Sequence, residues 1–162
     1  MASEVISSAL LMVATIIATI ALINAVFPSI YGMSGTITTV THNVNDQMKT
    51  DLKFIYETTD TTNHLTAWVK NTGSSNIYLT NFNNTDLFYG EADGVMSRAT
   101  LNGTSGSYWT YTIENGNGDS TWSPGQTMRI DITSADNFVP GEDYKIRLTL
   151  PNGAFTEDYF TK

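Results

Sequence analysis

The chain has 162 residues and a formal net charge of -8, and it contains no cysteine. An acidic chain cannot neutralise phosphates, so nucleic acid is excluded as a class of partner. Without cysteine there is no disulfide, no zinc thiolate site and no thiol nucleophile. The length suits one domain of ordinary size together with an additional apolar segment.

That apolar segment comes first in the chain. From Val5 to Phe27 no side chain carries a charge, and a helix of about 20 such residues spans the apolar core of a bilayer. The preceding letters, MASE, contain an acid and no base, whereas a cleaved signal peptide begins with basic residues. We therefore expect segment 5–27 to lie in a membrane or in the core of an assembly.

Small residues recur among the larger apolar ones in this segment, where they would let neighbouring helices approach closely. A lone anchor needs only apolar side chains, so a plain anchor and a helix that packs against copies of itself both remain open. The residues expected to make assembly contacts are Leu10, Leu11, Ala14, Ala18, Ala21, Leu22 and Ala25.

Three helix-disturbing residues follow: Pro28, Gly32 and Gly35 predict a kink. Beyond them a spacing of three or four predicts an amphipathic helix over about 36–49, with its upper part packed on the following domain. We expect one helix over 1–50, kinked near Pro28. The apolar residues that set this spacing are Ile37, Val40, Val44 and Met48.

From Asp51 the apolar period changes to two, beginning with Leu52, Phe54 and Tyr56. Segments rich in Gly, Pro and Asn separate the candidate strands. This pattern predicts that 51–162 form an all-β antiparallel sandwich, so the fold class is α+β. After strands near 52–56 and 65–69, the further candidates read NIYLTNF, DLFYG, SYWTYTIEN, QTMRIDITS, DYKIRLTL and AFTEDYF.

No pattern of catalytic residues or cofactor binding emerges, so we expect neither an enzyme nor a cofactor. His42 and His64 are isolated, and the sequence lacks nucleophile, phosphate-loop and dinucleotide motifs. The loop with Asn115, Asn117 and Asp119 alternates oxygen ligands as a calcium loop does, but it lacks the later bidentate Glu. A plain hairpin turn is favoured there over a metal site.

Two further sets of residues point to the surface of the β domain. Asn83 and Asn102 each begin an Asn-X-Thr sequence, which is the acceptor pattern for N-glycosylation. Adjacent strand residues face opposite sides of a sheet, so at least one large aromatic is expected outside. Trp109 and Trp122 are the candidates for an exposed contact surface.

The order of segments carries a family resemblance. The uncharged helix is followed by PSIYGMSGTI, DLKFIYET, AWVKNTG and LPNG, and from Ser3 to about Gly153 this order resembles the FlaG/FlaF family of type IV pilin-like proteins of the archaeal flagellum (archaellum). Glu4 resembles the glutamate at the start of the pilin helix, which pairs with a neighbouring subunit during assembly. The basic leader usual in pilins is absent from MASE, so the chain is expected to be unprocessed or to have been recorded without its leader.

The resemblance implies a pilin-like helix, an immunoglobulin-like sandwich and no catalytic residue. It implies a stator component of the archaellum, in the archaeal cell envelope, with the helix in the membrane or a filament core and residues 51–162 outside the cytoplasm. The implied partners are copies of itself, FlaF, the S-layer or cell envelope, and lipid. An archaellin or adhesive pilin subunit is the first alternative, and a membrane-tethered module that binds the S-layer or a glycan through Trp109 or Trp122 is the second.

Overall fold

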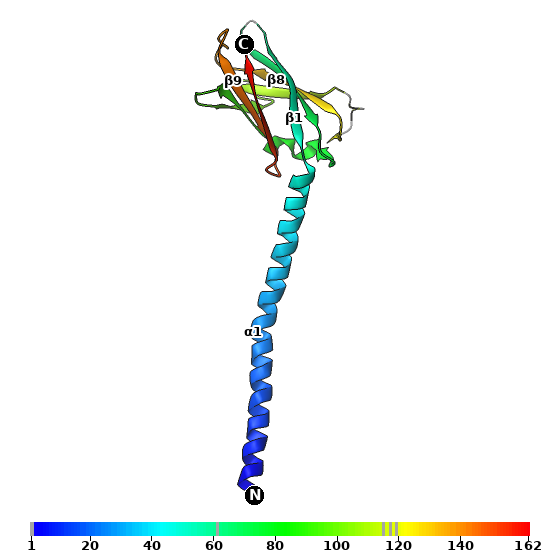
Figure 1. Cartoon of the computed structure of the whole chain (residues 1–162), viewed down its shortest axis with the longest axis vertical. Helices are drawn as coiled ribbons and strands as arrows, with labels where there is room; N and C mark the ends of the chain where they lie inside the picture. Colours follow the sequence, from blue (N-terminus) through cyan, green and yellow to red (C-terminus); the bar gives the residue numbers. More distant parts are fainter. Residues whose placement is uncertain (1, 61, 115, 117, 119) are drawn as a thin grey trace. The chain divides into compact units, whose positions relative to one another are not determined.

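The computed structural model describes residues 2–60, 62–114, 116, 118 and 120–162 (Figure 1). The chain divides into two compact units, 1–43 and 44–162, and each is described by itself. Helix α1 (Ala2–Lys49) makes up the first unit and enters the second. The long N-terminal helix and the β domain predicted from the sequence are both confirmed.

Helix α1 continues through the residues that were expected to kink it. Pro28 lies inside the helix, although it has no N–H to donate to the carbonyl of Asn24. Gly32 and Gly35 are also helical, and a Cβ added at either would meet nothing within 4 Å in this chain. These three residues do not interrupt the helix.

The second unit contains ten described strands in two sheets. The larger sheet has the order β1-β2-β8-β6-β5-β4-β9-β10, and the smaller pairs β3 with β7. The strands are β1 (Leu52–Thr59), β2 (His64–Asn71), β3 (Ile77–Tyr78), β4 (Asp86–Glu91), β5 (Ser97–Leu101), β6 (Tyr108–Ile113), β7 (Thr121–Trp122), β8 (Thr127–Thr133), β9 (Asp143–Thr149) and β10 (Phe155–Thr161).

The larger sheet folds over on itself to enclose the core. Strand β5 pairs with β4 on one side and β6 on the other, and the two edge strands β1 and β10 lie beside each other. The β5–β6 pair is parallel, so the sandwich is not wholly antiparallel as predicted. The inward positions of its strands are apolar, for example Leu65, Ile130, Ile132, Ile146 and Leu148.

Three segments differ from the predicted strands. NIYLTNF gives only the short strand β3 and then a 3-10 helix, η1 (Leu79–Asn84), which places Phe82 in the core. Strands β5 and β7 were not predicted at all. Each has too few inward apolar residues to show an alternating pattern: only Ala99 is buried in β5, and only Trp122 in β7.

The prediction that Trp109 and Trp122 form an exposed contact surface is wrong. Both side chains are fully buried. Trp109 lies opposite the inward-facing Ile132 of β8 and packs against Phe82, with ring centroids 5.8 Å apart. Trp122 Nε1 donates a hydrogen bond to the carbonyl of Gln126 at 3.0 Å. Neither indole can therefore serve as a stacking platform for a glycan.

The turn that follows β2 holds the C-terminal end of α1. Asn71 is fully buried, and its Nδ2 donates to the carbonyls of Ser75 and Trp122, each at 3.0 Å. The backbone N–H of Ser74 donates to the carbonyl of Lys49 at 2.9 Å, which satisfies a helix-terminal acceptor. The Asn-Thr-Gly segment is thus a structural joint between the helix end and the sheet.

Gly73 is required at this joint by close backbone contact. A Cβ added there would contact the carbonyl oxygen of Lys49 and lie 2.5 Å from the backbone nitrogen of Asp51. Both neighbours are backbone atoms, so neither can move aside by changing a rotamer. Even an alanine does not fit without displacing the chain.

We predict that Gly73→Ala lowers the free energy of unfolding of the β domain by about 1–3 kcal/mol, the usual cost of overpacking. Urea unfolding of the full-length chain in detergent, followed by fluorescence of the buried Trp109 and Trp122, measures the loss. Ser74→Ala is the matched control, because Ser74 is exposed and contributes only its backbone to the joint. Equal stability of the two variants would contradict the prediction.

Candidate assembly helix and surface sites

The described side chains of α1 are exposed within this chain. Every one from 2 to 42 is classed as exposed, and Leu10, Leu11 and Leu22 keep 66, 67 and 64% of their surface accessible. Val44 and Met48, which belong to the second unit, are exposed by 47 and 80%, so the prediction that these apolar side chains pack on the domain is wrong. The described apolar side chains of α1 are therefore exposed and are not part of a core of their own unit.

Polar side chains within the apolar segment are satisfied by the helix itself. The hydroxyls of Ser8, Thr15 and Thr19 donate to the carbonyls of Val5, Met12 and Thr15 at 2.8–3.0 Å. Such bonds remove the cost of placing a hydroxyl in an apolar environment. The helix can thus enter lipid or a helix bundle without unpaired hydroxyls at these positions.

Four of the predicted contact residues share one face of α1. Ala14, Ala18, Ala21 and Ala25 are spaced by four, three and four positions, and at about 100° per residue they fall within about 60° of one another. Ala9 lies well away from that face. The small side chains form a stripe along which another helix could approach closely.

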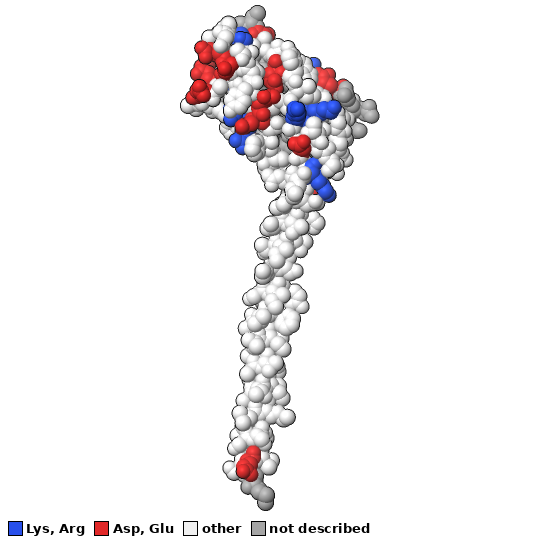
Figure 2. Space-filling model, viewed as in Figure 1, with Lys and Arg blue, Asp and Glu red and all other residues white. Residues whose placement is uncertain are grey.

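The helix also meets the requirements for a membrane span. Its most apolar window has a mean hydropathy of 2.5, and it is the one described helix long and apolar enough to cross a bilayer. No Asp, Glu, Lys or Arg occurs between Glu4 and Asp46. Figure 2 shows the corresponding uncharged surface. Glu4 lies in the first turn, where a carboxylate interacts favourably with the helix dipole.

An acidic pair lies where the two edge strands of the β domain meet. A bulge between Phe54 and Tyr56 reverses the alternation of β1, so that Tyr56 is exposed and Glu57 turns inward. Glu57 Oε1 is buried, and no described residue donates a hydrogen bond to it. Burial, together with the nearby carboxylate of Asp158 on β10, raises the pKa of Glu57 from 4.5 to about 7.

Sequence reasoning missed Glu57 because alternation through Leu52, Phe54 and Tyr56 places Glu57 outside. A bulge inserts one residue and leaves no signal in so short a pattern.

On the outer face of the neighbouring strands, Lys145 forms an ion pair with Glu157 at 3.2 Å. The Tyr159 hydroxyl and the Glu157 carboxylate raise the pKa of Lys145.

The two candidate glycosylation sites differ in accessibility. Asn83 on η1 and Asn102 after β5 are both exposed. In the first sequon Thr85 is buried, whereas in the second Thr104 is exposed. Asn102 has a φ of 52°, a conformation that asparagine tolerates at turns. The second site therefore offers the complete acceptor sequence on the folded surface.

The candidate metal loop lies outside the described residues, because Asn115, Asn117 and Asp119 are not among them. In the described part of the chain, His, Asp and Glu side chains do not gather in groups of three that could hold a metal ion. His64 Nδ1 instead lies 3.2 Å from the hydroxyl of Thr133.

Comparison with known proteins assigns the family. The family model described as archaeal-type flagellin matches residues 2–160. The chain belongs to the archaeal-type flagellin family. A relative from Archaeoglobus fulgidus, described only as an uncharacterized protein, is 35% identical over 166 residues, which cover 99% of each chain.

Solved structures of archaellum proteins have a similar fold. The archaellum periplasmic stator protein FlaG of Sulfolobus acidocaldarius is 25% identical, with a TM-score of 0.59 over 68% of this chain and 99% of that one. The FlaF–FlaG stator complex of the same organism gives 25% identity and a TM-score of 0.58, over 67 and 87% of the two chains. The resemblance to the FlaG/FlaF family is confirmed.

The archaeal flagellum of Methanospirillum hungatei also aligns with this chain. Its subunit is 13% identical, with a TM-score of 0.68 over 96% of this chain and 92% of that one. At this identity the similarity concerns the fold alone. The fold of this chain is thus also found in an archaeal flagellum.

The raised pKa of Glu57 makes stability depend on pH. The folded state holds this proton more tightly than the unfolded state, so the contribution of Glu57 to stability is fully present below about pH 4.5 and is lost as pH rises through 7. We predict that Glu57→Gln increases stability at pH 8 by about 1 kcal/mol, a modest figure because solvent screens the half-exposed group. At pH 4 the gain should disappear.

Urea unfolding of the full-length chain at both pH values tests this prediction. Glu142→Gln, on an exposed turn, is the control, because it removes the same charge without relieving burial. A gain from Glu57→Gln that is the same at pH 4 and pH 8 would show that the Glu57 carboxylate is not responsible.

Proposed function

We propose that the chain is a structural, stator-type component of the archaellum that assembles through α1 in the archaeal cell envelope. The observation that carries this proposal is an uncovered apolar helix on a domain that resembles the stator protein FlaG. The archaellum stator proteins that this chain resembles are structural components, so no catalytic role is assigned.

The proposed location follows from the chemistry of the two segments. The uncharged helix suits lipid, while an acidic domain with an exposed Asn102 acceptor sequence suits the outside of the cell. We place the uncharged part of α1, about residues 5–27, in the membrane or a helix bundle and residues 51–162 beyond the cytoplasm. The S-layer or another part of the envelope is the proposed attachment.

The proposed partners are copies of the same chain and a FlaF-type protein. The FlaF–FlaG stator complex supports the second partner, because its structure resembles this chain at 25% identity. Self-assembly is supported by the stripe from Ala14 to Ala25. Helices that meet along small residues gain close van der Waals contact, and any apolar area removed from water contributes about 25 cal/mol per Å².

A filament subunit is the second candidate, and the flagellum of Methanospirillum hungatei supports it because the alignment covers both helix and domain. Abundance distinguishes the two functions. We predict that quantitative mass spectrometry of archaellated cells finds this chain far less abundant than the major filament protein, by about tenfold or more. Comparable abundance would favour the filament subunit over the stator.

Replacing an alanine of the stripe with a larger residue tests whether the helices assemble along it. We predict that Ala18→Leu or Ala21→Leu weakens self-association at least about tenfold, which corresponds to about 1.4 kcal/mol. Both positions are exposed within the chain, so a leucine there disturbs no internal contact. Negative-stain electron microscopy before and after detergent removal, with sedimentation analysis, measures the effect.

Ala9→Leu is the matched control, because it makes the same change on another face of the same helix. It should assemble like the wild type, and all three variants should keep a folded β domain by circular dichroism. Normal assembly of the Ala18→Leu and Ala21→Leu variants would show that the alanine stripe is not part of the assembly interface.

A further inference from the structure

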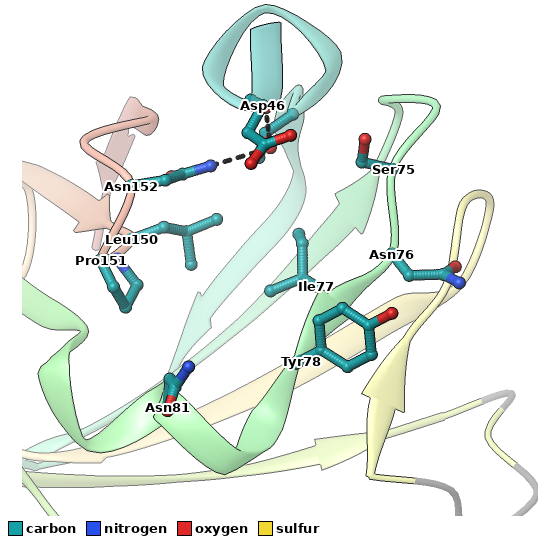
Figure 3. A pocket seen from close by; sticks show the side chains of 10 residues that line it. Asp46, Ser75, Asn76, Ile77, Tyr78, Asn81, Leu150, Pro151 and Asn152 are labelled. Carbon is teal, nitrogen blue, oxygen red and sulfur yellow. Dashed lines mark hydrogen bonds between the residues drawn. The ribbon is translucent and has the colours of Figure 1, made fainter. Parts of the chain in front are cut away.

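A pocket of about 460 Å³ opens within the second unit, between the end of α1, β3 and the turn after β9 (Figure 3). Its volume lies in the range of small-ligand sites. Ile77 and Leu150 supply an apolar floor, and the ring of Tyr78, whose side chain is 64% exposed, stands beside it. The pocket thus combines apolar carbon surface with an accessible aromatic ring.

One lip of the pocket is held by hydrogen bonds. Asn152 Nδ2 donates to Thr50 Oγ1 at 2.9 Å, and Asn152 Oδ1 accepts a bond from the N–H of Ala154 at 3.1 Å. Thr50 Oγ1 in turn donates to the carbonyl of Asp46 at 2.7 Å. This lip is therefore formed before any ligand arrives, which lowers the entropy cost of binding.

Other polar groups of the pocket have no side-chain partner among the described residues. These are the amides of Asn76 and Asn81, the hydroxyl of Tyr78 and the carboxylate of Asp46. Each amide offers both donors and acceptors, and the carboxylate accepts only. Together they can pair with a ligand whose hydroxyls both donate and accept.

The charge of the pocket restricts the ligand further. None of the residues described as lining it is basic, and Asp46 contributes a negative charge. Phosphate, sulfate and carboxylate groups would be repelled, because no cation is present to compensate them. A neutral ligand with many hydroxyls and an apolar C–H face fits both the polar groups and the floor.

We propose that this pocket binds a neutral sugar residue. The C–H face of the sugar lies against Ile77, Leu150 and the ring of Tyr78, while its hydroxyls pair with the amides of Asn76 and Asn81 and with the carboxylate of Asp46. Binding at this site involves only residues of the second unit, so it does not depend on assembly through α1. This pocket, and not the buried indoles of Trp109 and Trp122, is the glycan-binding site that we propose for the domain.

The experiment is a titration of the full-length, ¹⁵N-labelled chain in micelles of a detergent without sugar. The probes are methyl glycosides of glucose, mannose, galactose and N-acetylglucosamine, with sodium phosphate as the anion. We expect at least one glycoside to shift the side-chain amide signals of Asn76 and Asn81 saturably, with a Kd of about 1–10 mM. Phosphate should cause no such shift.

Variants locate the site. Asn81→Ala and Tyr78→Ala should each weaken binding at least about fivefold, whereas Asn83→Ala, an exposed residue on the same 3-10 helix that does not line the pocket, should bind like the wild type. An unchanged spectrum elsewhere confirms folding. The proposal is overturned if no glycoside gives saturable shifts, if phosphate binds as well, or if neither pocket variant weakens binding.

Discussion

The described apolar side chains of α1 are exposed, and this places a constraint on the rest of the molecule. Side chains such as Leu10, Leu11 and Leu22 are stable only in lipid or against other helices. The domain must therefore fold without help from the first unit. It does so around its own core, in which Trp109, Trp122 and Phe82 are nearly or completely buried. The segment proposed to meet partners, α1, and the segment with its own core, the β domain, are thus separate along the sequence.

The joint between these elements is made by backbone atoms. The turn after β2 holds Lys49, the last residue of α1, and Asp51 just beyond it. Ser74 donates to the Lys49 carbonyl, and the N–H groups of Thr72 and Gly73 donate to the Asp51 carbonyl. The absence of a Cβ at Gly73 allows these backbone groups to approach closely enough to form the hydrogen bonds.

The sequence predicted the elements that depend on long patterns. The helix and the strongly alternating strands β8 and β9 were found because many residues agree with one period.

Features that depend on the placement of a single residue were missed. Neighbouring aromatic residues on a strand face opposite sides of the sheet, but the sequence does not say which of them faces the core. Trp109 faces inward because β6 pairs with β8 so that Trp109 lies opposite Ile132, and no local pattern reveals this pairing. The bulge in β1 likewise hid Glu57. The polar pocket could not be predicted, because Asp46, Asn81 and Asn152 meet only after folding.

The position of Glu57 bears on the two edge strands of the domain. Long edges such as β1 and β10 invite another strand, and inward-facing charges discourage that pairing. Glu57 and Asp158 stand on the two edges that lie beside each other. A strand inserted between them would bury both carboxylates, which costs far more than the backbone hydrogen bonds gained. Glu57 and Asp158 thus make the space between these two edges unfavourable for a further strand.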